Sequence, residues 1–550
     1  MGKTVTIFCK NTGRTHRVPL GFNLEEVYEL LEIKMPHGVT SAKVNNKVEG
    51  LHFALFNDKD IEFLDVTSPS GMRTYTRSLF FVLYKAVHDL YPKGRLRIDT
   101  PVSNGYYCRL DGEFDAGLIR RRMQEIVDAD LPFHRVTCHT SEAIALFREH
   151  GLENKAKLLE GLGSLYTNYY TLDDVADYFY GSLLIRTGQI RLFDVVPYGD
   201  GLLLRLPDPE NPEQLRPMVE QSKMFDVFRE QHRWQEILGV STIGELNKAN
   251  DLGLTNQLIN VTEALQEKKI SQLADRIAAN PKLKVILIAG PSSSGKTTFS
   301  KRLSVQLMAC GVKPIPVSLD DYFVDREKTP RTAAGDFDYE HIEAMNIPLF
   351  NQQMNALLQG EEVELPRYNF QTGLSEKSGT RLRLAPDMLL ILEGIHALNP
   401  MLTKDIPEEN KFKIYASALT TILLDDHNYI PTTDNRLLRR IVRDYKYRGY
   451  SAEDTISRWP SVRKRKKKWI FPFQEKADVI FNSSTLYELA VLKKHIFPLL
   501  TAVQPEESCY DEVRGIVKIL NYVKEADVDD EIPPTSLVRE FIGGNTFYRK

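Results

Sequence analysis

One eight-residue segment constrains the fold of this 550-residue chain more than any other. Residues 290–297 match the pattern G-x-x-x-x-G-K-[ST] in full. The apolar residues 285–289 before it predict a buried parallel strand, and residues 298–307 after it predict a helix. A phosphate-binding loop requires a strand, this loop and a helix in that order. The sequence therefore predicts a nucleotide site in an α/β domain.

The residue types of this loop have direct chemical reasons. Glycines let backbone N–H groups turn toward phosphates without a Cβ clash, and the N-terminus of the following helix favours the bound anion. Lys296 is predicted to reach the β- and γ-phosphates of ATP, and Thr297 to place its hydroxyl on Mg²⁺. The predicted ATP-binding residues are Gly290, Pro291, Ser292, Ser293, Ser294, Gly295, Lys296, Thr297 and Thr298.

Two further predicted strands end in acids. Asp320 follows the strand at 316–319, and Glu393 follows the apolar strand at 388–392. We expect the first of these strands to lie beside the strand of the loop, so that its acid reaches the ligand edge of the sheet. Asp320 could there take a proton from an attacking hydroxyl, and Glu393 could hold the water shell of Mg²⁺. The alternative for Asp320 is a residue that only caps a helix.

Arginines recur at helical spacing after the predicted sheet strands. They are Arg436, Arg439, Arg440 and Arg443. An arginine-bearing helix beyond the core predicts a lid that neutralises the charge of a transferring phosphate. A solvated basic face is the alternative.

Composition places the chain among ordinary globular proteins. It is 42% hydrophobic and 26% charged, and its formal net charge is −3. This balance gives no global reason to expect nucleic-acid or membrane binding. The five cysteines form no CxxC pair, and we find no apolar run of about 18 residues, so we expect a reducing, cytoplasmic location without a membrane span. Oligomer formation stays open.

The length predicts several domains, in a multidomain α/β architecture. Residues 207–212 are rich in prolines and polar residues and are the clearest predicted boundary. The predicted units are 1–66, 67–210, a helical connector at 211–282, the loop-bearing domain at 283–485 and a helical extension at 486–550.

Local patterns near the N-terminus are those of a small mixed unit. Residues 4–9 predict a strand, residues 11–13 a hairpin turn, and Asn23 the N-cap of a helix at 24–31. In the next unit, residues 183–186 and 202–206 are alternating stretches of the kind expected for strands.

Residues 283–485 resemble the uridine kinase and phosphoribulokinase family over several ordered motifs. The segment 318–321 is similar to the family segment that carries the catalytic base, and the resemblance places that role on Asp320. Segments 335–340 and 366–370 are similar to two family segments near the acceptor. The other site residues that the resemblance implies are Asp338 and Tyr368 for the acceptor, Glu393 for Mg²⁺, Arg440 and Arg443 as catalytic lid residues, and Arg448 for the lid and the substrate.

This resemblance implies a parallel sheet flanked by helices and an ATP:nucleoside 5′-phosphotransferase activity, with uridine or cytidine as acceptor. Two positions depart from the family pattern. Residues 371–373 stand where related kinases carry a histidine that reads the pyrimidine, and Tyr450 stands where a second lid arginine follows Arg448. A kinase for another small alcohol or a sugar phosphate is therefore an open alternative.

The N-terminal half resembles two α+β modules. Residues 1–66 are similar to a TGS domain, and residues 67–205 to the second additional domain of threonyl-tRNA synthetases, which edits mischarged tRNA. The positions that correspond to its two histidines and its later Cys and His are Arg77, Phe81, Phe179 and Leu183. Arginine is no base at neutral pH and the other three side chains are apolar. We therefore expect the fold without the hydrolysis, and a sensing or regulatory role.

A second class of function is a nucleotide-gated, RNA-binding switch in which the TGS-like half contacts RNA. The basic run at 463–468 could bind RNA phosphates. Because this run lies within the lid region, contact with an acidic substrate or plain solvation is the other interpretation. No N-K-x-D motif for reading guanine follows the loop.

Overall fold

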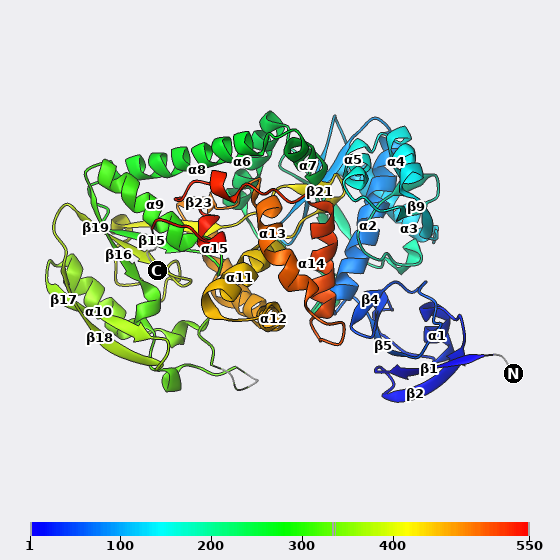
Figure 1. The fold of residues 1–550 in the computed structure, drawn as a ribbon, viewed down its shortest axis with the longest axis horizontal. Helices are drawn as coiled ribbons and strands as arrows, with labels where there is room; N and C mark the ends of the chain where they lie inside the picture. The colour runs from blue at the N-terminus through cyan, green and yellow to red at the C-terminus, as the bar shows by residue number, and fades with distance from the viewer. Residues whose placement is uncertain (1–2, 333–334, 336, 548–550) are drawn as a thin grey trace.

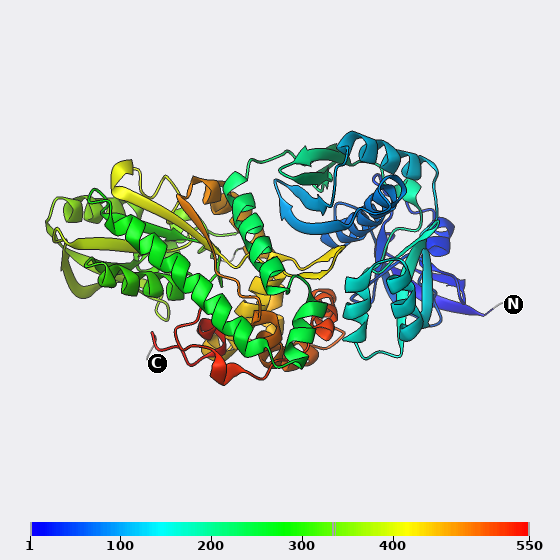
Figure 2. The ribbon, with the colours of Figure 1, turned by 90° about the horizontal axis from the view of Figure 1, so that it is seen from above.

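The computed structural model describes residues 3–332, 335 and 337–547, and all of their side chains except those of 464–468. The molecule is elongated, with the N-terminal half at one end and the sheet that carries the 290–297 loop at the other (Figure 1). A long helix, α8 (Thr255–Ala278), runs between the two ends (Figure 2). No described helix has the length and apolar character that crossing a membrane would need.

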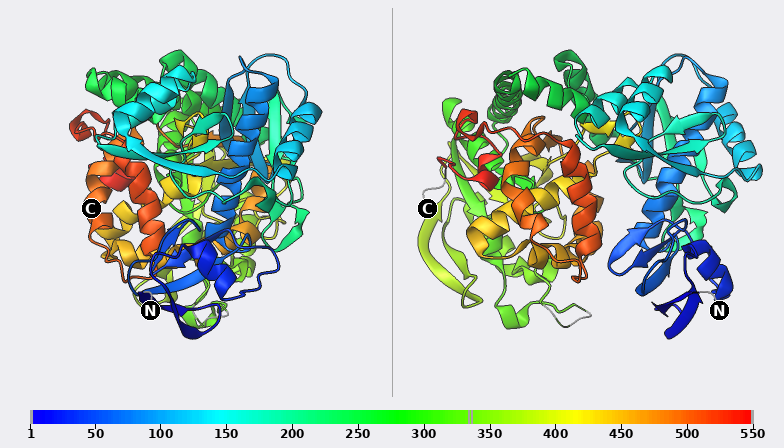
Figure 3. Two further views of the ribbon diagram at one scale, coloured as in Figure 1. Left: turned by 90° about the vertical axis from the view of Figure 1, so that its right-hand side faces the viewer. Right: turned by 45° about the vertical axis from the view of Figure 1, so that its right-hand side comes forward.

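The first unit is a five-stranded sheet with one helix. It lies beside the N-terminal end of the long helix that begins the next unit (Figure 3). Its strands, in the order β2-β1-β5-β3-β4, are β1 (Thr4–Cys9), β2 (Arg14–Pro19), β3 (Ser41–Val44), β4 (Lys47–Glu49) and β5 (Lys59–Leu64). Helix α1 (Leu24–Leu30) begins after Asn23, and Asn23 and Glu26 accept each other's backbone N–H as a capping box. The predicted first strand and N-cap are confirmed.

The second unit wraps two sheets around a central helix. Its helices are α2 (Pro69–Leu90), α3 (Ala116–Asp128), α4 (Thr140–Glu149) and α5 (Glu153–Glu160). One antiparallel sheet, ordered β11-β12-β7-β6, contains β6 (Leu96–Val102), β7 (Gly105–Leu110), β11 (Asp194–Tyr198) and β12 (Gly201–Arg205). The other, ordered β10-β9-β8, contains β8 (His134–His139), β9 (Tyr166–Leu172) and β10 (Val175–Asp177).

Of the two alternating stretches, residues 202–205 lie in β12, whereas the strand expected at 183–186 is wrong. Leu183 and Leu184 are both buried in an irregular segment, and only Arg186 forms an isolated bridge. Residues 207–212 contribute to a short hairpin of β13 (Pro207–Asp208) and β14 (Asn211–Leu215).

Three helices join this half to the loop-bearing domain. They are α6 (Ser222–Leu238), α7 (Ile243–Asp251) and α8. Helix α8 packs along α9 (Lys296–Ala309), where the Arg302 guanidinium lies 3.2 Å from Glu263 and 2.6 Å from Glu267. The helix that follows the loop is therefore fixed against the connector.

The loop-bearing domain is built on a five-stranded, all-parallel sheet in the order β16-β19-β15-β20-β23. Its strands are β15 (Val285–Ala289), β16 (Lys313–Ser318), β19 (Met388–Glu393), β20 (Lys411–Ser417) and β23 (Val479–Asn482). Every residue of β15 is buried. The expected adjacency of the Asp320 strand and the loop strand is wrong, because β19 lies between them. Ser318 and Glu393 nevertheless share one register position, so both acids reach the same edge.

Further helices and a hairpin complete this part of the chain. They are α10 (Ile347–Leu358), β17 (Glu362–Asn369), β18 (Leu374–Arg383), α11 (Thr432–Arg448), α12 (Ala452–Trp469), α13 (Glu488–Thr501), α14 (Tyr510–Tyr522) and α15 (Arg539–Ile542). The basic run lies at the end of α12, and the side chains of residues 464–468 lie outside those described.

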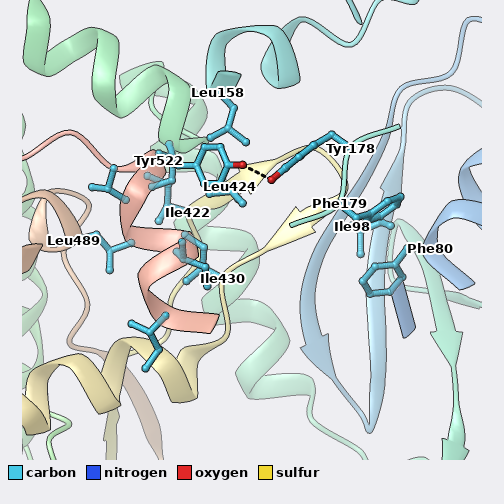
Figure 4. Close-up of a cluster of buried hydrophobic side chains, with 14 of the residues drawn as sticks. Phe80, Ile98, Leu158, Tyr178, Phe179, Ile422, Leu424, Ile430, Leu489 and Tyr522 are labelled. Carbon is cyan, nitrogen blue, oxygen red and sulfur yellow. Dashed lines mark hydrogen bonds between the residues drawn. The ribbon is translucent and has the colours of Figure 1, made fainter. Parts of the chain in front are cut away.

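A small hairpin of the loop-bearing domain joins it to the N-terminal half. This hairpin, β21 (Leu423–Asp425) and β22 (Asn428–Tyr429), places apolar side chains beside those of the second unit and of α13 and α14 (Figure 4). The hydroxyls of Tyr178 and Tyr522 are hydrogen-bonded across this junction. One continuous apolar core therefore connects the two halves.

Candidate active site

The backbone of the 290–297 loop is shaped by close approaches that only small residues allow. A Cβ atom on Gly290 would lie 2.0 Å from the Ala416 carbonyl oxygen, and Gly295, at φ +79°, begins α9 in the left-handed region. The hydroxyls of Ser293 and Ser294 are buried and have no hydrogen-bond partner in the described part of the chain. Such buried, unpaired hydroxyls suit a ligand rich in oxygen acceptors.

Lys296, Thr297 and Glu393 meet directly at the loop. The Thr297 hydroxyl donates to Glu393 Oε2 over 3.2 Å, and Lys296 Nζ lies 3.9 Å from Glu393 Oε1. Burial raises the pKa of Glu393 to about 6, although the charge of Lys296 opposes this shift. A carboxylate beside a hydroxyl is an oxygen donor pair that suits Mg²⁺, and the lysine suits phosphate oxygens. These residues therefore fit both groups that the sequence predicts here, the phosphates of ATP and Mg²⁺.

Asp320 lies in a 3₁₀ turn (Leu319–Tyr322) at the end of β16. The cap of this turn is Ser318, whose hydroxyl accepts the Asp320 N–H over 3.2 Å. The Asp320 carboxylate accepts no hydrogen bond from the described residues, so the interpretation as a helix cap is wrong. Desolvation by the surrounding protein raises the pKa of Asp320, while the positive charges of Lys296 and Arg448 oppose the rise. A more basic, accessible carboxylate suits a proton acceptor.

Aromatic rings line the side of the sheet near Asp320. Tyr368 is buried, and its ring lies edge-on to Phe323 at 5.5 Å and to Phe370 at 5.0 Å. Its backbone N–H donates to Asp321 Oδ1 over 3.4 Å, which ties the hairpin β17–β18 to the base-bearing turn. Phe370 is 60% exposed. The cluster therefore offers one accessible ring face beside the predicted base.

Asp338 lies next to this aromatic cluster in sequence and in space. Its neighbour Tyr339 packs edge-on to Phe323 at 5.7 Å, and the Asp338 carboxylate accepts the Glu340 N–H over 3.2 Å. Asp336, in the same family-like segment, lies outside the described residues. The structure thus brings Asp338 and Tyr368 to one side of the sheet edge.

The arginines of α11 divide into three groups. Arg440 lies 3.5 Å from the Ser292 hydroxyl, and Arg436 donates to the Ser292 carbonyl over 3.1 and 3.3 Å. Arg439 is fully buried and paired with Glu488.

Arg443 and Arg448 do not reach the loop in this structure. Both bond to Asp444, at 2.8 and 3.5 Å, and Arg440 bonds to the same carboxylate at 3.2 Å. Of the two arginines predicted to be catalytic, the structure brings only Arg440 to the loop.

Two residues at the loop had no individual role predicted from the sequence. Arg436 had the same helical spacing as its neighbours, and only its contact with Ser292 distinguishes it. Glu540 accepts hydrogen bonds from the backbone N–H and the hydroxyl of Thr298 at 3.3 and 2.8 Å. No local pattern could have found Glu540, because 242 residues separate it from Thr298.

The four positions that the sequence comparison predicted to correspond to editing residues lie together in the N-terminal half. Phe81 and Phe179 pack with ring centroids 5.6 Å apart, and Leu183 is buried nearby. Arg77 donates to the Ser182 carbonyl over 2.9 Å. This arrangement contains no proton acceptor at any of the four positions.

The fold and this site define a P-loop phosphotransferase: a parallel sheet whose loop, lysine and two acids share one edge, with arginines above them. Comparison with known proteins gives the family. Residues 285–490 match the family described as "Phosphoribulokinase / Uridine kinase family". The protein belongs to this family.

Three relatives show how the likeness is divided along the chain. The uridine kinase of Lactobacillus helveticus is 30% identical over 208 residues, which cover 38% of this chain and 90% of the relative. That of Deinococcus deserti is 30% identical over 209 residues, 38% of this chain and 91% of the relative. The N-terminal region is similar to the threonine–tRNA ligase of Syntrophotalea carbinolica, 33% identical over 161 residues, 28% of this chain and only 25% of that ligase.

Proposed function

We propose that the protein transfers the γ-phosphoryl group of ATP to a hydroxyl of a nucleoside, with uridine or cytidine as the acceptor. The observation that carries this proposal is the shared edge at which Thr297 and Lys296 contact Glu393 while Asp320 keeps an unbonded carboxylate. Phosphate-holding groups and a proton acceptor are thus adjacent, as in-line phosphoryl transfer requires. The likeness to uridine kinases supports the choice of acceptor class.

Each residue has a defined task in this proposal. The loop N–H groups, Lys296 and Arg440 hold and neutralise the phosphates, and Asp320 orients the acceptor hydroxyl and takes its proton. Thr297 and Glu393 would hold Mg²⁺, which supplies charge neutralisation between the phosphates when bound. The raised pKa of Asp320 makes its carboxylate a better proton acceptor than an ordinary aspartate.

The aromatic cluster supports a nucleoside over a sugar phosphate or another small alcohol. The exposed ring of Phe370 provides an apolar face on which a planar base can stack, and the buried Tyr368 ring packs edge-on against it. A sugar phosphate would instead need cationic groups on this side, and Arg326, a cation beside the cluster, donates to Tyr339 and to the Phe370 carbonyl. The proposal assigns acceptor stacking to this cluster.

ADP release tests this proposal. The full chain with Mg-ATP is incubated with uridine, cytidine, other nucleosides, ribulose 5-phosphate and pantothenate, and ADP is measured above the background without acceptor. Stimulation by a pyrimidine nucleoside, lost in Asp320→Asn, is the expected result. Stimulation by ribulose 5-phosphate or pantothenate alone would overturn the nucleoside assignment, and turnover unaffected by every acceptor would overturn the kinase.

For the N-terminal half we propose a retained fold without editing hydrolysis, because Arg77, Phe81, Phe179 and Leu183 provide no base or nucleophile. Incubation of the full chain with a mischarged threonine tRNA tests this proposal. Release of the amino acid at the rate without protein is expected, and accelerated release would contradict it.

A further inference from the structure

Near the C-terminal end of the chain, residues 531–544 form a strap that crosses the helices beside the loop. Its centre is firmly anchored: Ser536, Leu537 and Phe541 have no exposed surface. The Ser536 hydroxyl donates to Glu263 of α8 over 2.7 Å, and the Arg439 guanidinium lies 5.0 Å from the centre of the Phe541 ring. The strap is therefore part of the folded domain.

Leu537 and Glu540 bring this strap to the phosphate-binding turn itself. A Leu537 methyl lies 3.4 Å from the position that a Cβ atom on Gly295 would occupy. Glu540 is partly exposed, and its carboxylate accepts from both the N–H and the hydroxyl of Thr298 in the first turn of α9. Since Gly295 has no side chain to cap this helix, Glu540 provides an anionic cap from a distant part of the chain.

The N–H and hydroxyl donors that Glu540 binds lie where a phosphate-binding loop holds phosphate. Free N–H groups at the N-terminus of the helix after a glycine-rich loop hold the phosphates of a nucleotide, and the helix dipole favours any anion there. A carboxylate and a phosphate cannot both accept the same N–H, and their negative charges repel each other. Glu540 also contributes to the raised pKa of Glu393, which agrees with its position beside the loop.

We propose that the Glu540 side chain is a built-in competitor of ATP: it occupies the Thr298 donors in the free protein and rotates away when a nucleotide phosphate binds. Because the strap is anchored at Ser536 and Phe541, only the side chain moves. The inference rests on the proposed function, in that the loop binds ATP. It adds a residue that sets the affinity for ATP from outside the loop and the lid.

The test is a titration of the full chain with a fluorescent ATP analogue and Mg²⁺, without acceptor. Glu540→Gln and Glu540→Ala are expected to lower the Kd about tenfold, the size of a lost charge-assisted hydrogen bond. Glu531→Gln is the matched control, since it removes the same charge from the strap while its partner is Asn256 of α8. Its Kd is expected to equal that of the wild type.

Melting temperatures of the same variants separate competition from simple capping. A lower melting temperature with an unchanged or higher Kd would overturn the competitor and make Glu540 a permanent cap. Equal Kd values for all four proteins would overturn the inference alone. An absence of ATP binding in every protein would overturn the proposed function together with the inference.

Discussion

The junction between the two halves and the edge of the parallel sheet both gather charged side chains, and they differ in how those charges are paired. At the junction, Lys155 lies 2.6 Å from Asp177 and 2.8 Å from Asp425, and His427 lies 2.7 Å from Asp177. These four side chains are at most 2% exposed. Each of these four side chains thus has a close polar partner among the other three.

At the sheet edge the pairing is incomplete. Lys296 is 3.9 Å from its nearest carboxylate, Asp320 accepts no hydrogen bond from the described residues, and two loop hydroxyls are unpaired. Desolvation outweighs the nearby positive charge and raises the carboxyl pKa values of Asp320 and Glu393. The comparison indicates that closed networks, in which the buried charges are fully paired, hold the domains together. At the open edge, where pairing is incomplete, the groups stay available to bind a ligand and to accept a proton. The predictions that follow test this division.

The largest effect is expected for the proton acceptor. Asp320→Asn removes the basic oxygen while keeping the shape of the side chain, so kcat should fall about 10²- to 10⁴-fold. The melting temperature should stay close to that of the wild type, because no hydrogen bond to this carboxylate is lost. ADP release with the best acceptor and thermal unfolding of the same preparation provide the two measurements.

The neighbouring acid is the control for this variant. Asp321→Asn alters a carboxylate whose contact is the Tyr368 backbone N–H, and an amide oxygen can still accept that bond. Its kcat should fall less than about tenfold. If the two variants lost activity equally, the assignment of the base to Asp320 would fail.

Breaking the closed network should give the largest loss of stability. Lys155→Met leaves Asp177 and Asp425 buried without their shared cation, which should lower the free energy of unfolding by about 3–5 kcal/mol. Denaturant unfolding of the full chain measures this loss. For comparison, Lys85 is equally buried, but two of its three carboxylate partners are 60% and 63% exposed. Lys85→Met should therefore cost only about 1 kcal/mol. Equal losses would show that closure of the network does not matter.

Sequence patterns predicted the local parts of this molecule and missed its long-range contacts. The strand at 285–289, the loop and the following helix were predictable because hydrophobic periodicity and glycine positions act within a few residues. The order of strands was predicted wrongly, since β19 inserts between β15 and β16 from about 70 residues further along the chain. Periodicity gives the face of a strand but does not identify its neighbours.

The same limit applies to the site. Lys296, Thr297 and Glu393 were predicted by motif and meet in the structure, whereas Glu540 has no motif. Arg440 and Arg443 had identical sequence support and both bond to Asp444, yet only Arg440 also reaches the loop. Such distinctions depend on side-chain pairing that spacing does not encode.

The incomplete pairing at the open edge should also lower the free energy of unfolding. The pKa of Glu393 rises from 4.5 to about 6 on folding, so ionisation destabilises the folded form. The favourable contribution of the protonated Glu393 carboxyl to folding stability is fully present below pH 4.5 and is lost as the pH rises through about 6. In protein free of nucleotide and metal, the free energy of unfolding of Glu393→Gln should therefore be about 2 kcal/mol higher than that of the wild type at pH 7.5. The two proteins should converge near pH 4.5.

Activity provides the second half of this test. The variant that gains stability should lose kcat, because an amide is a poorer Mg²⁺ ligand than a carboxylate. Raising the Mg²⁺ concentration should recover part of the loss. A variant that is less stable at pH 7.5 would contradict the idea that the open edge stores unfavourable charge.

The smallest effect is expected at the rim, where Arg448 is 51% exposed and lies 3.5 Å from Asp444. Exposed ion pairs contribute little, so Arg448→Ala should change the free energy of unfolding by less than about 0.5 kcal/mol. Because Asp444 still binds Arg440 and Arg443, the lid should keep its shape. If Arg448 contacts the substrate, KM for the nucleoside should rise a few-fold while kcat stays near that of the wild type. A fall in kcat with unchanged KM would instead move Arg448 from substrate binding to phosphate neutralisation, and would extend the open edge outward to the end of α11.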